Sequence, residues 1–223
     1  MAVSIQLLAA SLCTKAAIDT QAEAMETPPA SNHERLLENF VNRPHSILRL
    51  RLQPFCLLHW LWLEYIASPF VITSKEISLA DIELAALVCS SRTSEQILAK
   101  ITAKNGNIWK RTAARLWHWR NRKTDLKAAS QAFIAYQDDY CSLPEFAAEG
   151  SNRDPKLPVV LYYAASLIKE TGWAEDTVLT MPLGKVVWYN AALGYLNSGD
   201  TSIISDRERQ AMAALDALTG AGK

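Results

Sequence analysis

The stretch Phe55-Cys-Leu-Leu-His-Trp-Leu-Trp-Leu-Glu-Tyr-Ile-Ala67 carries apolar side chains at nearly every position of a helical wheel. A helix that is apolar on all sides is typically buried in the core of a protein. The stretch begins after Pro54 and ends before Ser68-Pro69, because a residue that precedes proline avoids the helical region. We therefore expect a central, buried helix around which the rest of the chain folds.

Helix start and stop signals on either side of this stretch predict further helices. Ser78 with Asp81, and Thr93 with Gln96, have the spacing of a capping box, in which side chains satisfy free backbone N–H groups. Glycine or proline stands near most of the expected helix ends. The fold class expected is mainly α, a compact domain of roughly eight helices, which include 55–67, 78–89, 93–105, 108–122, 125–140, 158–170, 182–197 and 205–218.

The best strand signal lies just before the central helix. From Ile47 to Leu52 the sequence alternates leucine and arginine, which is the period of two that a strand shows. We expect at most a short strand or hairpin near residues 46–73.

The domain organisation follows from length and from the positions of the prolines. A chain of 223 residues can bury a sizeable core, and its 49% hydrophobic and 21% charged residues are typical of a globular protein. We expect residues 1–32 to form a partly flexible N-terminal arm with a linker that contains Pro28 and Pro29. Residues 33–218 then form the helical domain, which admits a joint at 141–157.

Charge and hydropathy exclude several classes of protein. The 23 basic and 23 acidic residues cancel, so no whole-molecule field attracts nucleic acid or a membrane. No run approaches the ~20 apolar residues of a membrane span. The apolar N-terminal run has no preceding Lys or Arg, which argues against a signal peptide. We expect a cytoplasmic protein that contacts no membrane.

No segment has the spacing of a catalytic, cofactor or metal site. The four cysteines lie more than thirty residues apart, and the histidines have no partner at ligand spacing. Glycine-rich phosphate loops and serine nucleophile elbows are missing from the sequence. We interpret His59, which lies among apolar neighbours, as a buried histidine that is hydrogen-bonded to the backbone rather than as a catalytic base. We expect no enzyme activity, no cofactor and no metal.

The segment Lys104–Lys127 is the most open to a functional interpretation. It holds eight Lys or Arg residues against one Asp, together with three tryptophans. A helical wheel separates an apolar stripe of Ala113, Leu116, Trp117 and Arg120 from a basic side. Our candidate partner-binding residues are Lys110, Arg111, Arg115, His118 and Arg122. The competing interpretation, which the wheel favours, makes the tryptophans core residues and leaves the arginines solvated or paired with the acidic stretch Asp138–Asp154.

Three segments carry a resemblance to a known family. They are Leu50-Arg-Leu-Gln-Pro-Phe-Cys-Leu-Leu-His59 with Ser68-Pro69-Phe70, then Ala80-Asp-Ile-Glu-Leu-Ala-Ala-Leu-Val-Cys-Ser90, then Met181-Pro-Leu-Gly-Lys-Val-Val-Trp188. In this order and spacing they resemble small proteins of the tail-morphogenesis regions of tailed phages and prophages, described as tail assembly chaperones. The resemblance covers most of residues 46–215 in outline.

The resemblance implies a non-enzymatic role in virion morphogenesis, in the host cytoplasm. Such a protein binds the long helical tape-measure protein, or another tail protein, and keeps its apolar stripes from aggregating until the tail tube polymerises. No binding residues are carried over from the family. Two other classes stay open: a virion structural component, such as a tail terminator or connector, and a nucleic-acid-binding module that uses the basic, tryptophan-rich helix 104–127.

Overall fold

The computed structural model describes residues 31–41, 43–72, 76–102, 108–141 and 158–198, together with 208 and 211. These residues form nine helices and one two-stranded hairpin, which confirms the mainly α fold expected from the sequence. In chain order the elements are α2 (Asn32–Glu38), β1 (Ser46–Ile47), β2 (Leu50–Arg51), α3 (Leu57–Tyr65), α4 (Leu79–Cys89), α5 (Ser94–Ile101), α6 (Ile108–Asn121), α7 (Leu126–Asp139), α8 (Val159–Thr171), α9 (Glu175–Thr180) and α10 (Leu183–Ser198).

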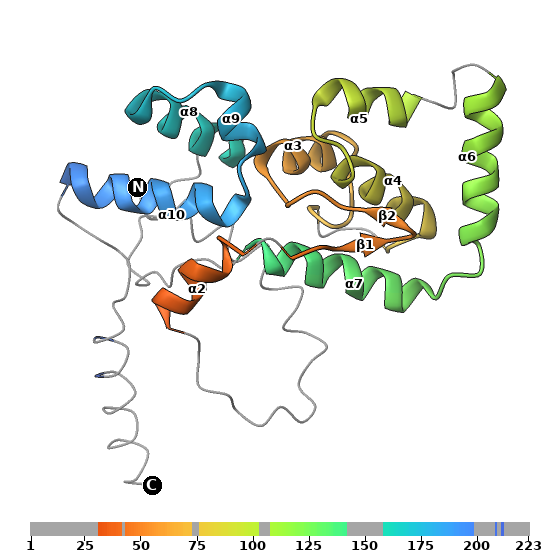
Figure 1. Ribbon diagram of the computed structural model, residues 1–223, viewed down its shortest axis with the longest axis horizontal. Coiled ribbons are helices and arrows are strands. Elements are labelled where there is room, and N and C mark those ends of the chain that lie inside the picture. Colours follow the sequence, from red (N-terminus) through yellow and green to blue (C-terminus); the bar gives the residue numbers. More distant parts are fainter. Residues whose placement is uncertain are drawn as a thin grey trace, which may run out of the picture.

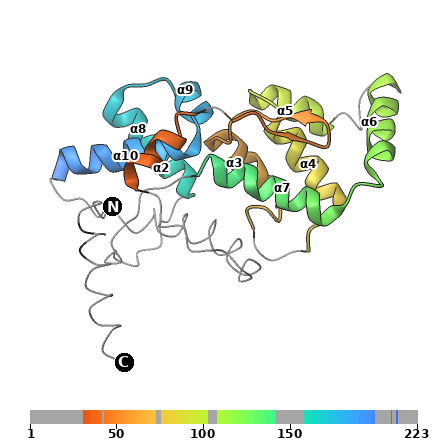
Figure 2. The ribbon, with the colours of Figure 1, turned by 60° about the horizontal axis from the view of Figure 1, so that its bottom comes forward.

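Helix α3 occupies the centre, as its apolar sequence predicts. It contacts α4 on one side and α8 and α9 on the other. The hairpin, α4, α5 and α7 lie toward one end of the molecule, and α2, α8, α9 and α10 toward the other (Figure 1, Figure 2). Helix α6 stands beyond α4 and α7 at the first end in both views.

The segment just before α3 joins three distant parts of the chain. The Gln53 N–H donates to the carbonyl of Cys89 at the end of α4, at 2.8 Å. The Phe55 carbonyl accepts from the N–H of Leu183 at the start of α10, at 2.9 Å. The Tyr136 hydroxyl of α7 donates to the Gln53 carbonyl at 2.7 Å. Segments of α3, α4, α7 and α10 that are far apart in the sequence therefore meet at this junction.

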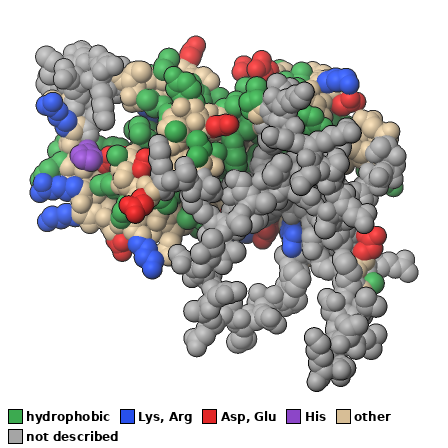
Figure 3. Space-filling view, turned by 180° about the vertical axis from the view of Figure 1, so that it is seen from behind, with side chains coloured by type: hydrophobic (Ala, Val, Ile, Leu, Met, Phe, Trp, Pro, Cys, Tyr) green, Lys and Arg blue, Asp and Glu red, His purple; other side chains and the backbone are tan. Residues whose placement is uncertain are grey.

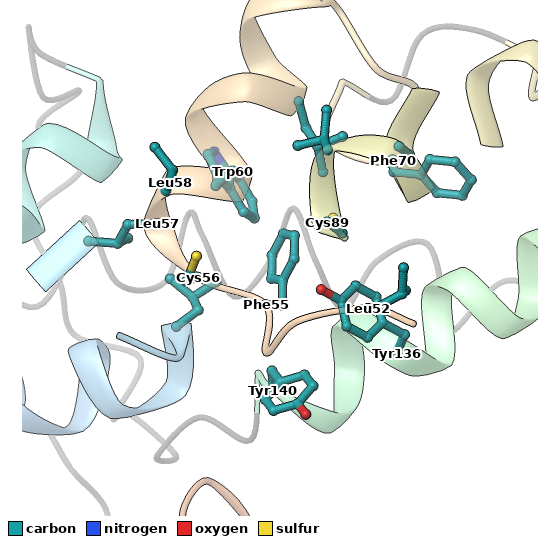
Figure 4. Packing of buried hydrophobic residues seen from close by; sticks show 14 of the residues in the cluster. Leu52, Phe55, Cys56, Leu57, Leu58, Trp60, Phe70, Cys89, Tyr136 and Tyr140 are labelled. Carbon is teal, nitrogen blue, oxygen red and sulfur yellow. The ribbon is translucent and has the colours of Figure 1, made fainter. Parts of the chain in front are cut away.

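The hydrophobic core surrounds this junction. The Phe55 side chain is fully buried and meets the Tyr136 ring edge to face, with centroids 5.8 Å apart. Figure 4 shows Phe55, Cys89 and Tyr136 close together, with Leu57 and Leu58 on the α3 side. One continuous cluster of buried side chains runs from the hairpin through α3 and α4 to α8 and α10, so the two ends share a core.

The helix starts follow the predicted capping chemistry. The Ser78 side chain accepts from the Asp81 N–H, and the Asp81 carboxylate accepts from the Ser78 N–H, which completes the capping box of α4. Thr93 caps α5 as expected, but the Gln96 side chain accepts from the Arg92 N–H. Gly172 ends α8 in the left-handed conformation, with φ of 72°.

The hairpin turns inside the alternating leucine and arginine run. Ser46 pairs with Arg51 and Ile47 with Leu50, and the turn residues Leu48 and Arg49 both have positive φ, at 49° and 66°. Positive φ at both central residues suits the right-handed twist of the flanking strands. The expectation of a short strand or hairpin here is confirmed, with a turn that usually takes Asn and Gly.

Two helices were not expected from the sequence. Helix α2 starts with a capping box of Ser31 and Glu34, inside the stretch taken as a linker, and the six-residue α9 precedes Pro182.

Residues 1–30 and 142–157 lie outside the described part, so the N-terminal arm and the joint stay predictions. The helix expected at 205–218 lies outside it too, apart from 208 and 211. Among the described helices, none is long and apolar enough to cross a bilayer.

Candidate functional site

Helix α6 is held against the body by its C-terminal half. The indole N–H of Trp117 donates to the Leu48 carbonyl in the hairpin turn, at 3.3 Å. His118 Nδ1 lies 2.7 Å from Glu83 Oε2 on α4. Asn121, the last residue of α6, is buried. These contacts fix which side of α6 faces the body.

The opposite side of α6 presents apolar side chains to solvent. Leu116 is 56% exposed and Trp119 is 57% exposed. They lie three positions apart, which places them on the same face of a helix. Leu126, at the start of α7, is also 40% exposed. Large apolar groups that adjoin on one exposed face, as Leu116 and Trp119 do, are a feature of binding surfaces.

Cationic side chains surround these apolar groups. Arg115, Arg120, Arg122 and Lys123 are all exposed. The Arg122 guanidinium lies over the Trp119 ring, 5.5 Å from its centroid, in a cation–π contact. In Figure 3 the Lys and Arg side chains gather along the left edge, where α6 lies.

The structure separates the five residues proposed from the sequence. Arg115 and Arg122 are exposed on the outer side of α6. The His118 side chain is exposed as well, but its Nδ1 lies 2.7 Å from Glu83 Oε2, so this nitrogen holds α6 against α4. The side chains of Lys110 and Arg111 lie outside the described part of the chain. They stay candidates on sequence alone.

The helical wheel assigned the faces of α6 correctly only in part. Arg115, His118 and Arg122 are exposed, as expected of the basic side, and Trp117 is half-buried. Leu116 and Arg120, which the wheel placed on the apolar stripe, are exposed, and so is Trp119. The wheel located the apolar side of the isolated helix, whereas the body contacts α6 through the Trp117 indole N–H and the His118 imidazole. These polar contacts run to Leu48 and Glu83, and nothing in the sequence around α6 reveals that they are near.

The acidic stretch does not neutralise α6 within the described residues. Asp139 lies 2.9 Å from Arg43 and 2.8 Å from His45, at the opposite end of α7 from α6. The Asp125 carboxylate, beside α6, accepts from the N–H groups of Lys127 and Ala128 as the N-cap of α7. The part of the stretch at 142–154 lies outside the described residues.

A small cavity lies beside His59. It encloses about 240 Å³ between the start of α3 and the α4–α5 loop, and is lined by Gln53, Pro54, Cys56, His59, Ser91, Arg92 and Thr180. This volume falls below the roughly 300–1,000 Å³ of ligand pockets.

The titratable groups of this cavity are in their unreactive forms. His59 Nε2 lies 2.8 Å from the Ser91 carbonyl, as expected of a buried histidine bonded to backbone. Burial lowers the pKa of His59 to about 4, although the carbonyls of Ser91 and Pro54 oppose the shift. Burial raises the pKa of the Cys56 thiol to about 11. At neutral pH the imidazole is uncharged and the thiol protonated, so the pair supplies no thiolate nucleophile.

No group of three or more His, Cys, Asp or Glu side chains in the described ranges is arranged to hold a metal ion. Comparison of the chain with protein-family models, curated proteins and solved structures finds no match. Among the described residues, the outer side of α6 is therefore the candidate site that the geometry favours.

Proposed function

We propose that this chain is a non-enzymatic binding protein that helps to assemble a phage or prophage tail in the host cytoplasm. It holds a helical tail protein, such as a tape-measure protein, through the outer side of α6. The observation that carries the proposal is the exposure of Leu116 and Trp119 among arginines. Tryptophan and arginine are the residues that most often dominate binding energy at protein interfaces.

The partner follows from the family resemblance and from physical chemistry. A tape-measure protein is long and helical, and its apolar stripes expose it to aggregation before the tube forms around it. An apolar stripe of this kind is recognised through contacts at i, i+3, i+4 and i+7. A helix that is anchored on one side and apolar on the other can cover part of such a stripe.

The test is co-expression with the tape-measure protein from the same genome. We expect the unaltered chain to raise the soluble fraction of that protein and to co-purify with it. The chain should be missing from purified particles, because an assembly chaperone leaves before the tail is complete. Recovery of the chain in stoichiometric amounts from particles would instead identify a structural component such as a terminator or connector.

A nucleic-acid-binding module is the second candidate, favoured by the same arginines and by the exposed indole. Phosphate contacts would make retention on DNA fall steeply as salt increases. The exposed Leu116 and Leu126 argue against this candidate, since aliphatic side chains find little to pack against on a phosphate backbone.

A further inference from the structure

The inference concerns the chemistry of the partner and rests on the proposed function. The surface involved, called here the α6 surface, consists of Arg115, Leu116, Trp119, Arg120, Arg122, Lys123 and Leu126. Its three apolar members are 40% to 57% exposed. They come from the second half of α6 and from the first residue of α7, on either side of the bend between the two helices.

The charge of this surface has one sign. Residues 115–127 contain five Lys or Arg residues and a single carboxylate, that of Asp125. Both Oδ1 contacts of Asp125, at 2.9 Å and 3.3 Å, go to backbone N–H groups of α7. Asp125 is therefore committed to capping α7, and the surface presents cations to whatever covers it.

The body holds the α6 surface in one orientation. The Trp117 indole N–H and His118 Nδ1 contact the body, and Asn121 is buried at the end of α6. The Arg122 guanidinium lies over the Trp119 ring, a position in which its N–H edge can still pair with an anion. Groups positioned before binding lose less side-chain entropy when a partner docks.

We infer that the α6 surface binds an acidic amphipathic helix. Leucine-type side chains on one stripe of that helix would pack on Leu116, Trp119 and Leu126. Glu or Asp side chains beside the stripe would pair with Arg115 and Arg122, and the aliphatic stems of these arginines would extend the apolar contact.

Two other occupants fit the surface less well. A second copy of this chain would bring the four cations of one α6 surface against the four of the other, and like charges across an interface disfavour association. A nucleic acid would satisfy the arginines, but it would leave the aliphatic side chains of Leu116 and Leu126 poorly packed, and Arg122 already covers one face of the Trp119 ring.

The experiment uses the full chain and three synthetic helical peptides of equal length. One peptide has a leucine stripe flanked by Glu, the second the same stripe flanked by Lys, and the third the Glu flanks with Ser in place of leucine. Fluorescence anisotropy measures the affinity of each. We expect the Glu–leucine peptide to bind at least roughly tenfold more tightly than either of the others.

Variants then locate the binding surface. The double variant Arg115→Glu with Arg122→Glu should bind the Glu–leucine peptide roughly tenfold or more weakly than the unaltered chain does, and should bind the Lys–leucine peptide more tightly. The Trp119→Ala variant should bind both leucine peptides more weakly. The matched control, Arg92→Glu with Lys169→Glu, removes two exposed cations from other helices or loops and should leave both affinities unchanged. Circular dichroism and thermal melting check that each variant folds.

Three results would overturn the inference. The first is equal binding of the Glu–leucine and Lys–leucine peptides. The second is a single-stranded oligonucleotide that binds more tightly than the Glu–leucine peptide. The third is a concentration-dependent dimer, detected by sedimentation, that Trp119→Ala abolishes.

The co-expression test separates this inference from the proposed function. If the Arg115→Glu, Arg122→Glu variant solubilises the tape-measure protein as well as the unaltered chain does, the proposed function stands and the inference falls. If the Glu–leucine peptide binds at the α6 surface but the unaltered chain solubilises no tail protein, the inference stands and the tail assembly function falls.

Discussion

His118 Nδ1 on α6 lies 2.7 Å from Oε2 of Glu83, a carboxylate that α4 carries on its buried side. Glu83 is only 8% exposed, and its other carboxylate oxygen is buried without a hydrogen-bond partner. A buried carboxylate with few partners is costly, so the contact with His118 both stabilises Glu83 and positions α6.

The first prediction is that His118→Ala destabilises the protein through Glu83. Removing the imidazole leaves the carboxylate without its described partner, and we expect the free energy of unfolding to fall by about 1–3 kcal/mol. Urea denaturation measures the loss. In a Glu83→Met background the same change should cost close to nothing, because no buried charge is left unpaired. Equal losses in the two backgrounds would mean that His118 acts independently of Glu83.

The second prediction concerns the close approach of α2 to α10. A Cβ added to Gly184 would overlap Oδ1 of Asn39, far inside van der Waals contact. Asn39 Nδ2 also donates to the Arg35 carbonyl at 2.8 Å, so the side chain cannot move without breaking this bond. We expect Gly184→Ala to lower the free energy of unfolding by about 2 kcal/mol.

The matched control removes the obstacle instead of the glycine. In an Asn39→Ala background, Gly184→Ala should cost much less, because the added methyl group then meets a smaller side chain. A cost that is independent of Asn39 would show that the clash is relieved elsewhere, and the predicted contact would be wrong.

The sequence predicted the parts of this fold that depend on local chemistry. The capping box of Ser78 and Asp81, the left-handed glycine at 172 and the apolar α3 can each be read from a few neighbouring residues. Helix α9 was missed because its six residues are too few for helical periodicity to be detected. Helix α2 was missed because its capping box follows a pair of prolines that dominated the interpretation.

The candidate site was only partly predictable, because it depends on contacts across the fold. Arg115 and Arg122 are exposed, as the basic side of the wheel predicts, but the sequence could not show which side of α6 faces the body. Glu83, the only charged residue in the body of α4 after its first turn, was the available signal. A lone carboxylate in an apolar helix requires a partner, and its partner lies 35 positions later in the sequence.

The third prediction is a stabilising change in the hairpin turn. Arg49 has a φ of 66°. This conformation is higher in free energy for a residue with a Cβ, whereas glycine adopts it readily. We expect Arg49→Gly to raise the free energy of unfolding by about 0.5–1 kcal/mol, as thermal and urea unfolding would measure. Arg51→Gly in strand β2 is the control and should destabilise the protein, since glycine weakens an extended strand. A loss of stability with Arg49→Gly would show that its side chain contributes more than the turn costs.

The last prediction follows from the burial of His59. The pKa of His59 is about 4 in the folded protein and near 6.5 in the unfolded chain. Between pH 6.5 and pH 4 the imidazole is therefore protonated in the unfolded state and neutral in the folded state. Stability is therefore fully present above pH 6.5 and is lost as the pH falls toward 4. At pH 5 this loss amounts to about 2 kcal/mol, at roughly 1.4 kcal/mol for each pH unit below 6.5.

A His59→Gln variant lacks the titrating group but keeps a donor that can reach the Ser91 carbonyl. Urea denaturation at pH 7.5 and pH 5 should show a larger loss for the unaltered chain than for the variant, by about 2 kcal/mol. Titration of the other histidines is common to both proteins and cancels in the difference, so parallel stability profiles would show that His59 is not a source of acid sensitivity.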